Sequence, residues 1–467
     1  MLENKPTILI PLSIQFSVRY LLRTGLLEKI RTIANPVILL GWSDAGLQME
    51  LEQLGCVVYP LPKAVLNAEF SKLRKKIHIM HFDRISSCST RIDRRRNNLI
   101  QPRFHRIKTT LRSFIYRMED AIPGRFENLC QKEEISIHQN TNLSIFDELI
   151  MEIRPDFLFS ITPYYLDEEF VCRAASSTNA KLSTAILSFD NLTTRPRIPV
   201  IFDQYLLWND YNKQELIRIY PETITKNVII VGSPQFDFYY DQSYLWDKKV
   251  WAQRLGIPEN RPVILYAAGP KEIAPFEPQW VIQLDSAIES GEIPGNPIIL
   301  LRRHPVDPPD RWTIIRQIAK NVIFDDPWAG GKDIMGQINV SRDDIEKLVS
   351  TLAYSNVHIN ASSTMTIDGA IFDKPQIGPA YDDQRTRTLD CAMKELYLRE
   401  HYLPITNSGG LEIAHSKTEL IQLINKAIVN PGRLSVERKN MVREICTFND
   451  GQSTKRVFDS LKKLILN

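Results

Sequence analysis

Short apolar runs alternate with longer amphipathic segments along the first half of the chain. The segment after the first run has apolar residues at positions 18, 21, 22, 26 and 30, which is the 3–4 spacing of an amphipathic helix. Asp44 is placed to cap a second helix that ends near Gly55. The runs of strand character lie at residues 7–12, 37–42, 56–61, 156–162, 181–187, 204–209 and 227–232. Strands that alternate with helices predict a parallel sheet covered on both faces.

The alternation pauses at "VGSPQFDFYYDQSYLW", residues 231–246, and then resumes. The second set of strand-like runs lies at residues 262–270, 297–305, 321–327, 356–360 and 375–378. After residue 410 the pattern becomes helical, at 416–429, 433–446 and 451–465. Because 467 residues are too many for one core, we predict two domains.

The predicted fold class is therefore α/β, with two doubly wound Rossmann-like domains that face a cleft. We place the domains at residues 1–235 and 246–450. We expect the last helix, residues 451–467, to cross back and pack on the first domain. Ligands of such sheets bind beyond the carboxyl ends of the strands, so the residues directly after each strand are the candidates for chemistry.

Composition adds few constraints on its own. The chain is 43% hydrophobic and 24% charged, values typical of globular proteins, and nowhere do about 18 uncharged apolar residues run together. Six cysteines lie far apart without a CxxC pair, which favours reduced thiols over a disulfide framework or a zinc site. No basic region followed by an apolar stretch opens the sequence, so we expect a cytoplasmic protein.

Charge is concentrated in one segment. Residues 71–117 hold 14 Lys and Arg residues but only Asp83 and Asp93 as acidic residues. One interpretation is a solvated insertion in the first domain. The other is attraction to an anionic surface, whether phospholipid, a polyanionic acceptor or nucleic acid. Since the segment contains no recognisable nucleic-acid-binding module, nucleic acid ranks below a membrane or a polyanion.

Hydroxyl side chains follow one strand of the second domain. Ser362, Ser363 and Thr364 come after "NVHIN" and precede an apolar helix. Free N–H groups and the partial positive charge of a helix start suit a diphosphate, and hydroxyls add donors without bulk. The alternative is an ordinary N-cap at Ser362 or Ser363. The local residues leave both interpretations open.

Two more strand ends carry candidate ligands. His304 directly follows the strand in "IILLRRHP", and its imidazole is expected at the cleft edge as a ligand or transition-state contact. Arg302 and Arg303 point to opposite faces, so only one of them can reach a phosphate, and Arg303 is our candidate. In "YAAGPKE", Gly269 allows close approach of the backbone and Lys271 could hold a phosphate oxygen, although Gly-Pro is also an ordinary turn.

Two further candidates lie on loops. Asp190, in "SFDNLTTRPRIP", is our candidate general base in the first domain, although an Asp-Asn turn needs no function. Trp328, in "DDPWAGGKD", could stack on a nucleobase or fill a gap at the surface. The sequence contains no metal-ligand cluster, Walker A loop, G-x-S-x-G or GxGxxG after a strand, so we expect no metal and no cofactor.

The order and spacing of these motifs resemble a known family. "LRRHP", followed about 55 residues later by "NASSTMTIDGAIFDKPQI", resembles the C-terminal half of GT-B transferases of bacterial surface carbohydrate synthesis. The residues of these motifs are also similar to those of the CDP-glycerol glycerophosphotransferases of teichoic acid assembly. "SFDNLT", "LLWNDYNKQEL" and "VIIVGSPQFDFY" add support, so that the resemblance covers roughly residues 180–460.

The resemblance implies a nucleotide-activated donor in the C-terminal domain, an acceptor on the N-terminal domain and no bound metal. By the same resemblance, His304 contacts the donor phosphate or sugar, and Ser362 to Thr364 hold the diphosphate. Asp368 stands where many such enzymes have a glutamate that binds a ribose or sugar hydroxyl. Asn360 and Ala361 stand where the glycerophosphotransferases tend to have Asp-Tyr, which favours a sugar donor.

We therefore expect a glycosyltransferase that moves a sugar from a nucleotide sugar to a hydroxyl of a surface polysaccharide or lipid-linked precursor. Its expected place is the cytoplasm, at the inner face of the cell membrane. Three alternatives stay open. They are a CDP-glycerol or ribitol phosphotransferase, a UDP-sugar 2-epimerase-like enzyme, and a non-catalytic nucleotide-sugar-binding protein.

Overall fold

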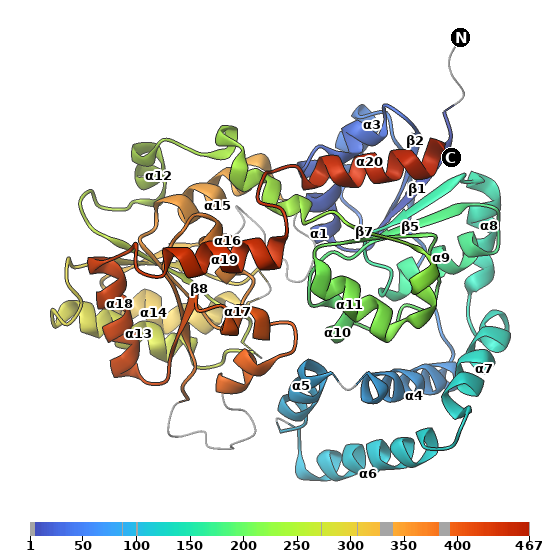
Figure 1. Ribbon diagram of the computed structural model, residues 1–467, viewed down its shortest axis with the longest axis horizontal. Coiled ribbons are helices and arrows are strands. Elements are labelled where there is room, and N and C mark those ends of the chain that lie inside the picture. Colours follow the sequence, from blue (N-terminus) through green and yellow to red (C-terminus); the bar gives the residue numbers. More distant parts are fainter. Residues whose placement is uncertain are drawn as a thin grey trace. The chain divides into compact units, whose positions relative to one another are not determined.

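The computed structural model describes residues 5–85, 87–99, 101–271, 273–305, 307–326, 340–382 and 393–466. The chain divides into two compact units (Figure 1). Unit 1 comprises Met1–Pro234 and Gln452–Asn467, and unit 2 comprises Gln235–Gly451.

Unit 1 is built, within the described residues, on a seven-stranded sheet of order β3-β2-β1-β4-β5-β6-β7. All of its neighbouring strands pair in parallel. The strands are β1 (Thr7–Leu12), β2 (Asn35–Leu40), β3 (Val57–Pro60), β4 (Phe157–Ser160), β5 (Lys181–Ala185), β6 (Gln204–Leu207) and β7 (Asn227–Ile230). Each lies within two residues of a run that the sequence predicts.

The helices of unit 1 connect these strands. They are α1 (Gln15–Val18), the π-helix η1 (Arg19–Arg23), α2 (Leu26–Ile30), α3 (Ala45–Gln53), α4 (Ala68–Arg84), α5 (Cys88–Leu99), α6 (Arg103–Asp120), α7 (Arg125–Asn140), α8 (Leu143–Ile153), α9 (Leu166–Ser176), α10 (Asn191–Thr194), α11 (Asp210–Ile219), the 3-10 helix η2 (Pro221–Thr225) and α20 (Ser453–Leu466). Asp44 caps α3 as predicted, because its carboxylate accepts the N–H of Leu47 at 2.9 Å. The predicted helix of residues 18–30 is interrupted at Gly25, whose φ is +72°.

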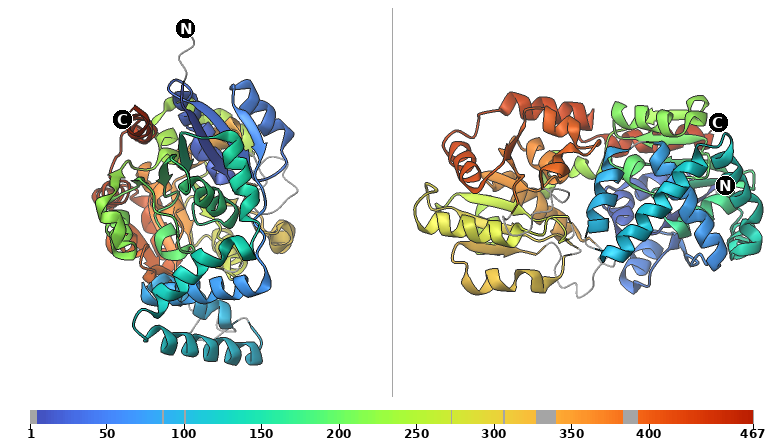
Figure 2. Two further views of the ribbon diagram at one scale, coloured as in Figure 1. Left: turned by 90° about the vertical axis from the view of Figure 1, so that its right-hand side faces the viewer. Right: turned by 90° about the horizontal axis from the view of Figure 1, so that it is seen from below.

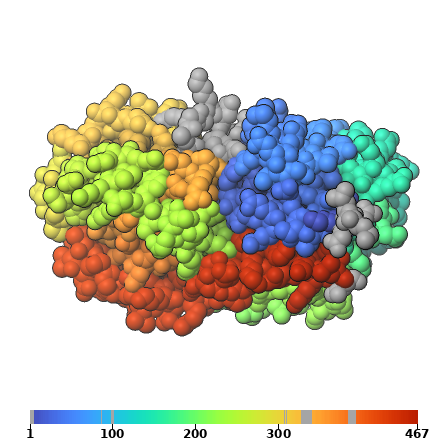
Figure 3. Space-filling model, turned by 90° about the horizontal axis from the view of Figure 1, so that it is seen from above, coloured from blue at the N-terminus to red at the C-terminus, as the bar shows by residue number. Residues whose placement is uncertain are grey.

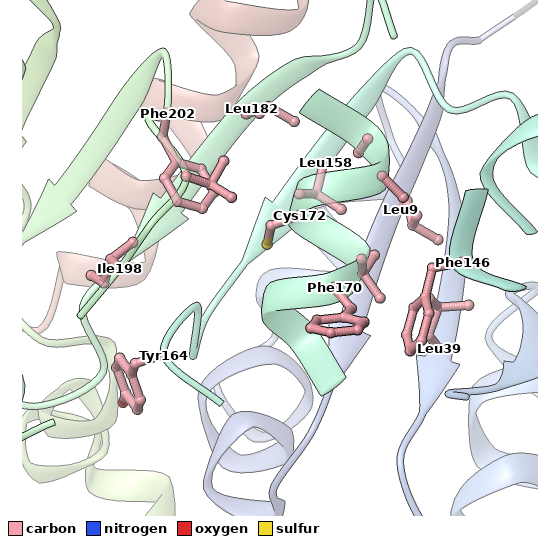
Figure 4. Packing of buried hydrophobic residues seen from close by; sticks show 14 of the residues in the cluster. Leu9, Leu39, Phe146, Leu158, Tyr164, Phe170, Cys172, Leu182, Ile198 and Phe202 are labelled. Carbon is pink, nitrogen blue, oxygen red and sulfur yellow. The ribbon is translucent and has the colours of Figure 1, made fainter. Parts of the chain in front are cut away.

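Alternate residues of the central strands pack on opposite faces of the unit 1 sheet. Leu9 and Leu39 belong to one buried cluster, which the helices α8 and α9 complete with Phe146 and Phe170 (Figure 4). The neighbouring strand residues Ile8, Ile10 and Ile38 belong to a second cluster on the other face. This period of two is the one that a strand covered on both sides requires.

The last helix, α20, packs within unit 1. Val457 and Leu461 are buried in the second cluster, and the Gln204 side chain donates to the carbonyl of Ser460 at 3.2 Å. Figure 3 shows this end of the chain, in red, beside the N-terminal segment in blue. The predicted return of the last helix to the first domain is therefore confirmed.

The basic segment forms an arm of helices between β3 and β4. Helices α4, α5, α6 and α7 make up this arm, and Figure 2 shows it in blue and cyan. A buried ion-pair network joins the arm to the rest of unit 1. In it Arg74 of α4 and Arg173 of α9 both contact Glu169, at 2.8 Å each.

Unit 2 is built, within the described residues, on a six-stranded sheet of order β10-β9-β8-β11-β12-β13. Its strands also pair in parallel. They are β8 (Val263–Ala267), β9 (Ile298–Arg302), β10 (Val322–Asp325), β11 (Val357–Asn360), β12 (Gln376–Pro379) and β13 (Leu411–Ala414). The prediction that only helices follow residue 410 is wrong for β13, a strand of four residues that pairs with β12 at the sheet edge.

The helices of unit 2 are η3 (Pro234–Tyr240), η4 (Gln242–Tyr244), α12 (Lys248–Leu255), α13 (Glu277–Glu289), η5 (Pro309–Trp312), α14 (Thr313–Ile318), α15 (Arg342–Tyr354), α16 (Met365–Ile371), η8 (Met393–Leu398), α17 (Leu403–Asn407), α18 (Lys417–Val429) and α19 (Ser435–Cys446). Those after residue 415 begin and end within two residues of the predicted segments. Among the described helices of the whole chain, none is long and apolar enough to cross a membrane.

The two doubly wound parallel sheets confirm the predicted fold class. In both units the strand order reverses beside the first strand of the sheet, between β1 and β4 in unit 1 and between β8 and β11 in unit 2. Connections leave such neighbours in opposite directions, so their carboxyl ends are where ligands of this fold class bind.

Candidate functional site

The ends of four strands in unit 2 lie side by side in register. Asp325 pairs with Arg302, Arg302 with Ala267, and Ala267 with Asn360. His304, Gly269 and Ser362 each lie two residues beyond this row. The strand ends therefore bring three of the sequence-predicted segments to one edge of the sheet, with Gly269 and Ser362 flanking the reversal of strand order.

The segment after β11 is organised by Asn360. Its side-chain oxygen accepts the N–H of Ser363 and the hydroxyl of Thr366, both at 3.0 Å. Helix α16 starts at Met365, whose N–H donates to the Ser363 hydroxyl at 3.3 Å. The Ser363 hydroxyl thus accepts the first N–H of the helix, while Asn360 fixes the turn before it, a role that the local sequence did not reveal.

Ser362 turns the chain into this helix. Its φ is +53°, in the left-handed region, and its hydroxyl donates to the carbonyl of Leu396 at 2.9 Å. The hydroxyl of Tyr402 also reaches Thr366, at 2.8 Å. The segment of η8 and α17 therefore packs against the start of α16 and fixes its backbone.

Unused hydrogen-bond donors remain at this turn. Within the described part of the chain, the N–H group of Thr364 has no partner, and the Thr364 side chain is exposed. The amide nitrogen of Asn360 is buried and also lacks a partner there. Because a buried donor without a partner costs free energy, this arrangement suits an anion or a polar ligand.

His304 lies at the neighbouring strand ends and is half-buried. Strand β8 lies between β9 and β11, so His304 and Ser362 are separated at the strand ends by two strand spacings, roughly 10 Å. The carbonyl of His304 accepts the N–H of Asp307 at 3.0 Å, which turns the chain back towards the sheet. One ligand of nucleotide size can therefore reach both the histidine and the turn.

The two arginines before His304 are held by acidic residues of β10 and its end. Arg302 is buried and pairs with Asp325 at 2.5 Å, and Arg303 pairs with Asp326 at 2.5 Å. The guanidinium of Arg302 is therefore committed to a buried ion pair. Arg303, the predicted phosphate ligand, already has its charge balanced by Asp326.

Buried charged side chains bond both backbone groups of Gly269 in the loop after β8. Both carboxylate oxygens of Glu277 accept the N–H of Gly269 at 3.0 Å, and Arg311 donates to the Gly269 carbonyl at 2.8 Å. The amide of the predicted Gly269 is therefore already in use. Lys271 is exposed.

Arg311 joins this loop to the segment after β9. Its guanidinium contacts Asp307 at 2.9 Å and Glu277 at 3.2 Å, and Asp307 also accepts the indole N–H of Trp312 at 2.6 Å. One guanidinium balances one of the two carboxylates, so the second holds its proton more strongly. Burial raises the pKa of Glu277 to about 8, against the opposing charge of Arg311.

Asp368, the predicted ribose or sugar ligand, lies in α16 and is buried. Its carboxylate accepts the hydroxyl of Tyr239 from η3. The close packing of α16 also explains Gly369, where a Cβ would overlap the side chains of His358 and Gln376. The helix can therefore pack tightly on β11 and β12 only with glycine at this position.

Asp190 is the candidate that lies outside this edge. Asp190 lies in unit 1, five residues after β5, and its carboxylate accepts the Thr194 hydroxyl at 3.1 Å and the Asn191 amide at 3.3 Å. Asp190 therefore offers the carboxylate that a general base needs, and it also forms the ordinary Asp-Asn turn of the alternative interpretation. Trp328 lies outside the described residues.

The equivalent edge of unit 1 is filled by its own carboxylate. Glu168 of α9 is fully buried between the ends of β1 and β4. It accepts hydrogen bonds from Ser13 after β1, from Ser160, and from the backbone of Ile161 and Thr162 after β4, at 2.6 to 3.0 Å. Unit 1 thus satisfies the donors of its reversal point internally, whereas unit 2 leaves donors unused.

Comparison with known proteins places the chain near transferases. A family model described as CDP-Glycerol:Poly(glycerophosphate) glycerophosphotransferase matches residues 201–463. The match spans the whole of the unit 2 edge described above. No curated protein matches the sequence.

Similar solved structures cover nearly the whole chain. An S. aureus MnaA–UDP complex has a TM-score of 0.55 at 11% identity and covers 98% of this chain and 97% of its own. A UDP-GlcNAc 2-epimerase from Neisseria meningitidis bound to UDP-GlcNAc has 0.54 at 13%, with coverages of 98% and 100%. A glycosyltransferase from Rickettsia africae has 0.51 at 13%, with coverages of 98% and 99%. At these identities the similarity shows the fold, which is that of GT-B glycosyltransferases and related epimerases.

The raised pKa of Glu277 predicts a specific dependence of stability on pH. Between about pH 4.5 and 8 the folded chain keeps a proton on Glu277 that the unfolded chain has lost, so the free energy of unfolding should fall as pH rises, by up to about 1.4 kcal/mol per pH unit. Glu277→Gln cannot ionise and should lack this slope. Urea unfolding of both proteins across this range measures the difference, and parallel curves would contradict the assignment.

Proposed function

Because the chain belongs to the CDP-glycerol:poly(glycerophosphate) glycerophosphotransferase family, we propose that it transfers a group from a nucleotide-activated donor to a hydroxyl of a cell-surface polymer or its lipid-linked precursor. The transferred group in this proposal is a sugar. The observation that supports it most directly is the turn after β11, which presents unused donors at the reversal of strand order.

In this proposal the donor diphosphate lies against Ser362, Ser363 and Thr364. The free N–H of Thr364 and the hydroxyls of Ser363 and Thr364 donate to its oxygens, and the amide of Asn360 orients the turn. His304 contacts the far end of the diphosphate or the sugar. Negative charge develops on the leaving nucleoside diphosphate, so donors fixed in advance at this edge lower the barrier to its departure.

The remaining predicted residues have narrower proposed roles. Lys271 is exposed near the loop after β8 and can add a cation to the diphosphate. Arg303 and Gly269 position the loops rather than bind ligand directly, since their groups are already paired. For Asp368 to hold a ribose hydroxyl, its bond to Tyr239 must open. Trp328 remains a proposed base-stacking residue, and Asp190 a proposed general base.

Glycerophosphate transfer is the second candidate. The description of the matching family favours it directly. The residues Asn360-Ala361 favour a sugar instead, because they depart from the Asp-Tyr expected of glycerophosphotransferases, and the uncharged side chain of Asn360 holds the turn before α16. The similarity to 2-epimerases is one of fold. Turnover of UDP-, GDP-, CMP- and CDP-linked donors separates sugar from glycerophosphate transfer, and isomerisation without an acceptor would identify an epimerase.

We also propose that the reaction proceeds in the cytoplasm, at the inner face of the membrane where envelope precursors are assembled, and needs no metal ion. In the described residues no group of three His, Cys, Asp or Glu side chains is arranged to hold one. We expect turnover to persist in excess chelator, with the dialysed enzyme as reference. Loss of activity that added Mg²⁺ or Mn²⁺ restores would contradict metal independence.

The N–H of Thr364 can be removed with little change to the backbone. Its φ of −58° is the one that proline requires, so Thr364→Pro deletes this donor and keeps the turn. Since a hydrogen bond to a charged group contributes about 1.5–3 kcal/mol, we expect nucleoside diphosphate binding to weaken at least about tenfold by calorimetry. Thr364→Ala, which keeps the N–H, is the matched control and should lose much less. Equal affinities of the two variants, both folded, would remove the anion site from this turn.

His304 provides the second test of the site. We expect His304→Ala to lower kcat by roughly 100-fold, because a donor aimed at the developing charge is lost. His415→Ala replaces an exposed histidine of the same unit and should keep wild-type activity. Unchanged turnover in folded His304→Ala protein, with the best donor of the screen, would exclude His304 from the chemistry.

A further inference from the structure

Helix α6 exposes an apolar face along its whole length. The α6 stripe is defined as the seven large apolar residues on this face, each more than half exposed: Phe104, Ile107, Leu111, Phe114, Ile115, Met118 and Ile122, the last just beyond the helix end. At 100° per residue they fall within an arc of about 100°. Phe104 is 83% exposed and Ile107 67%. Single exposed apolar residues are ordinary, but a continuous patch of this kind marks an interaction surface.

The polar face of α6 is turned towards the protein. Thr109 is buried, and Glu119 and Asp120 form ion pairs with Lys76 and Arg84 of α4, the second at 2.9 Å. The ammonium group of Lys76 also lies 5.4 Å from the ring centre of Tyr116. These contacts fix the rotation of α6 about its axis, so the stripe faces away from α4.

The arrangement is therefore the reverse of a surface helix in an ordinary domain, which buries its apolar face. Figures 1 and 2 show α6 as the outermost helix of the arm. Ion pairs hold the polar side of α6 inwards, and the apolar side is left uncovered within unit 1.

Positive charge borders the stripe. Arg103 and Lys108 are exposed and lie on opposite sides of it on the helical wheel. They belong to the segment 71–117 with its 14 basic and two acidic residues. An apolar face bordered by cations matches the boundary between acyl chains and anionic headgroups.

This charge pattern decides between possible occupants. A second copy docked stripe to stripe with its helix parallel would bring Arg103 and Lys108 near their own counterparts, where like charges repel. An antiparallel copy would offer these cations no unpaired acidic partner on α6, since Glu119 and Asp120 already pair with α4. Nucleic acid would use the cations and leave seven apolar residues uncovered. An anionic bilayer satisfies both the stripe and the cations.

We propose that α6 docks on an anionic phospholipid bilayer, with the α6 stripe inserted at the level of the headgroups and Arg103 and Lys108 on the lipid phosphates. The surface belongs to unit 1 and uses none of the residues assigned to nucleotide binding in unit 2. The inference therefore stands or falls separately from the proposed transferase activity.

Co-sedimentation of the full-length protein with vesicles tests the proposal. We expect binding to phosphatidylcholine vesicles that contain phosphatidylglycerol, weaker binding to phosphatidylcholine alone, and weakening by salt. Phe104→Ser/Ile107→Ser/Leu111→Ser should lower the partition coefficient at least about tenfold, since buried apolar area is lost. Ile135→Ser on α7 is the matched control, because Ile135 is 72% exposed but lies off the stripe, and it should bind like the wild type.

Arg103→Glu/Lys108→Glu tests the charges independently, and we expect a loss of about tenfold or more on anionic vesicles with little change on neutral ones. Nucleotide affinity of all these variants, measured by calorimetry, should equal that of the wild type. Absence of vesicle binding, or an equal loss in Ile135→Ser, would overturn the proposal. So would a stripe variant that dissociates a dimer in light scattering while its vesicle binding stays unchanged, since that result identifies a second copy as the occupant.

Discussion

The reversal of strand order beside the first strand of each sheet is the constraint on which the candidate site depends. At such a point two neighbouring parallel strands send their connections to opposite faces, and their terminal N–H groups need partners. Unit 1 supplies the partner itself, since the buried carboxylate of Glu168 receives donors from both sides. Unit 2 leaves the N–H group of Thr364 and the side-chain amide nitrogen of Asn360 without partners in the described residues. Of the two similar sheets, the one in unit 2 therefore has hydrogen-bond donors available for a ligand at this edge.

Buried charges hold the edge of unit 2 in place. Arg311 contacts Glu277 and Asp307 and donates to the carbonyl of Gly269, which joins the loops that follow β8 and β9. A buried charge network is costly to form and seldom adds stability, but it fixes geometry because its members cannot be separated without leaving a charge unpaired. The loop that carries His304 is therefore fixed in position before a ligand binds. Such a site suits a reaction that requires donors fixed before charge develops.

Helix α6 shows how ion pairs decide the orientation of an amphipathic helix. Hydrophobic periodicity alone would turn Phe104, Ile107 and Leu111 towards the core. The acidic residues of the other face instead form ion pairs with basic residues of α4, so the polar face of α6 packs towards the rest of the arm. The same ion pairs therefore hold the polar face of α6 inwards and leave its apolar face exposed.

The sequence by itself determined the elements whose signal is local. Runs of β-branched and apolar residues give the strands, the helical pattern after residue 410 gives α18 to α20, and Asp44 caps α3, since a strand or cap depends mainly on its own residues. The strand β13 was missed because four residues at a sheet edge carry too little pattern. Only tertiary structure decided that Asn360 fixes the turn before α16, that Glu277 meets Arg311 34 residues away, and that Arg303 is neutralised by Asp326. These roles depend on which strand ends become neighbours, and strand order is set by long-range packing that no local spacing records.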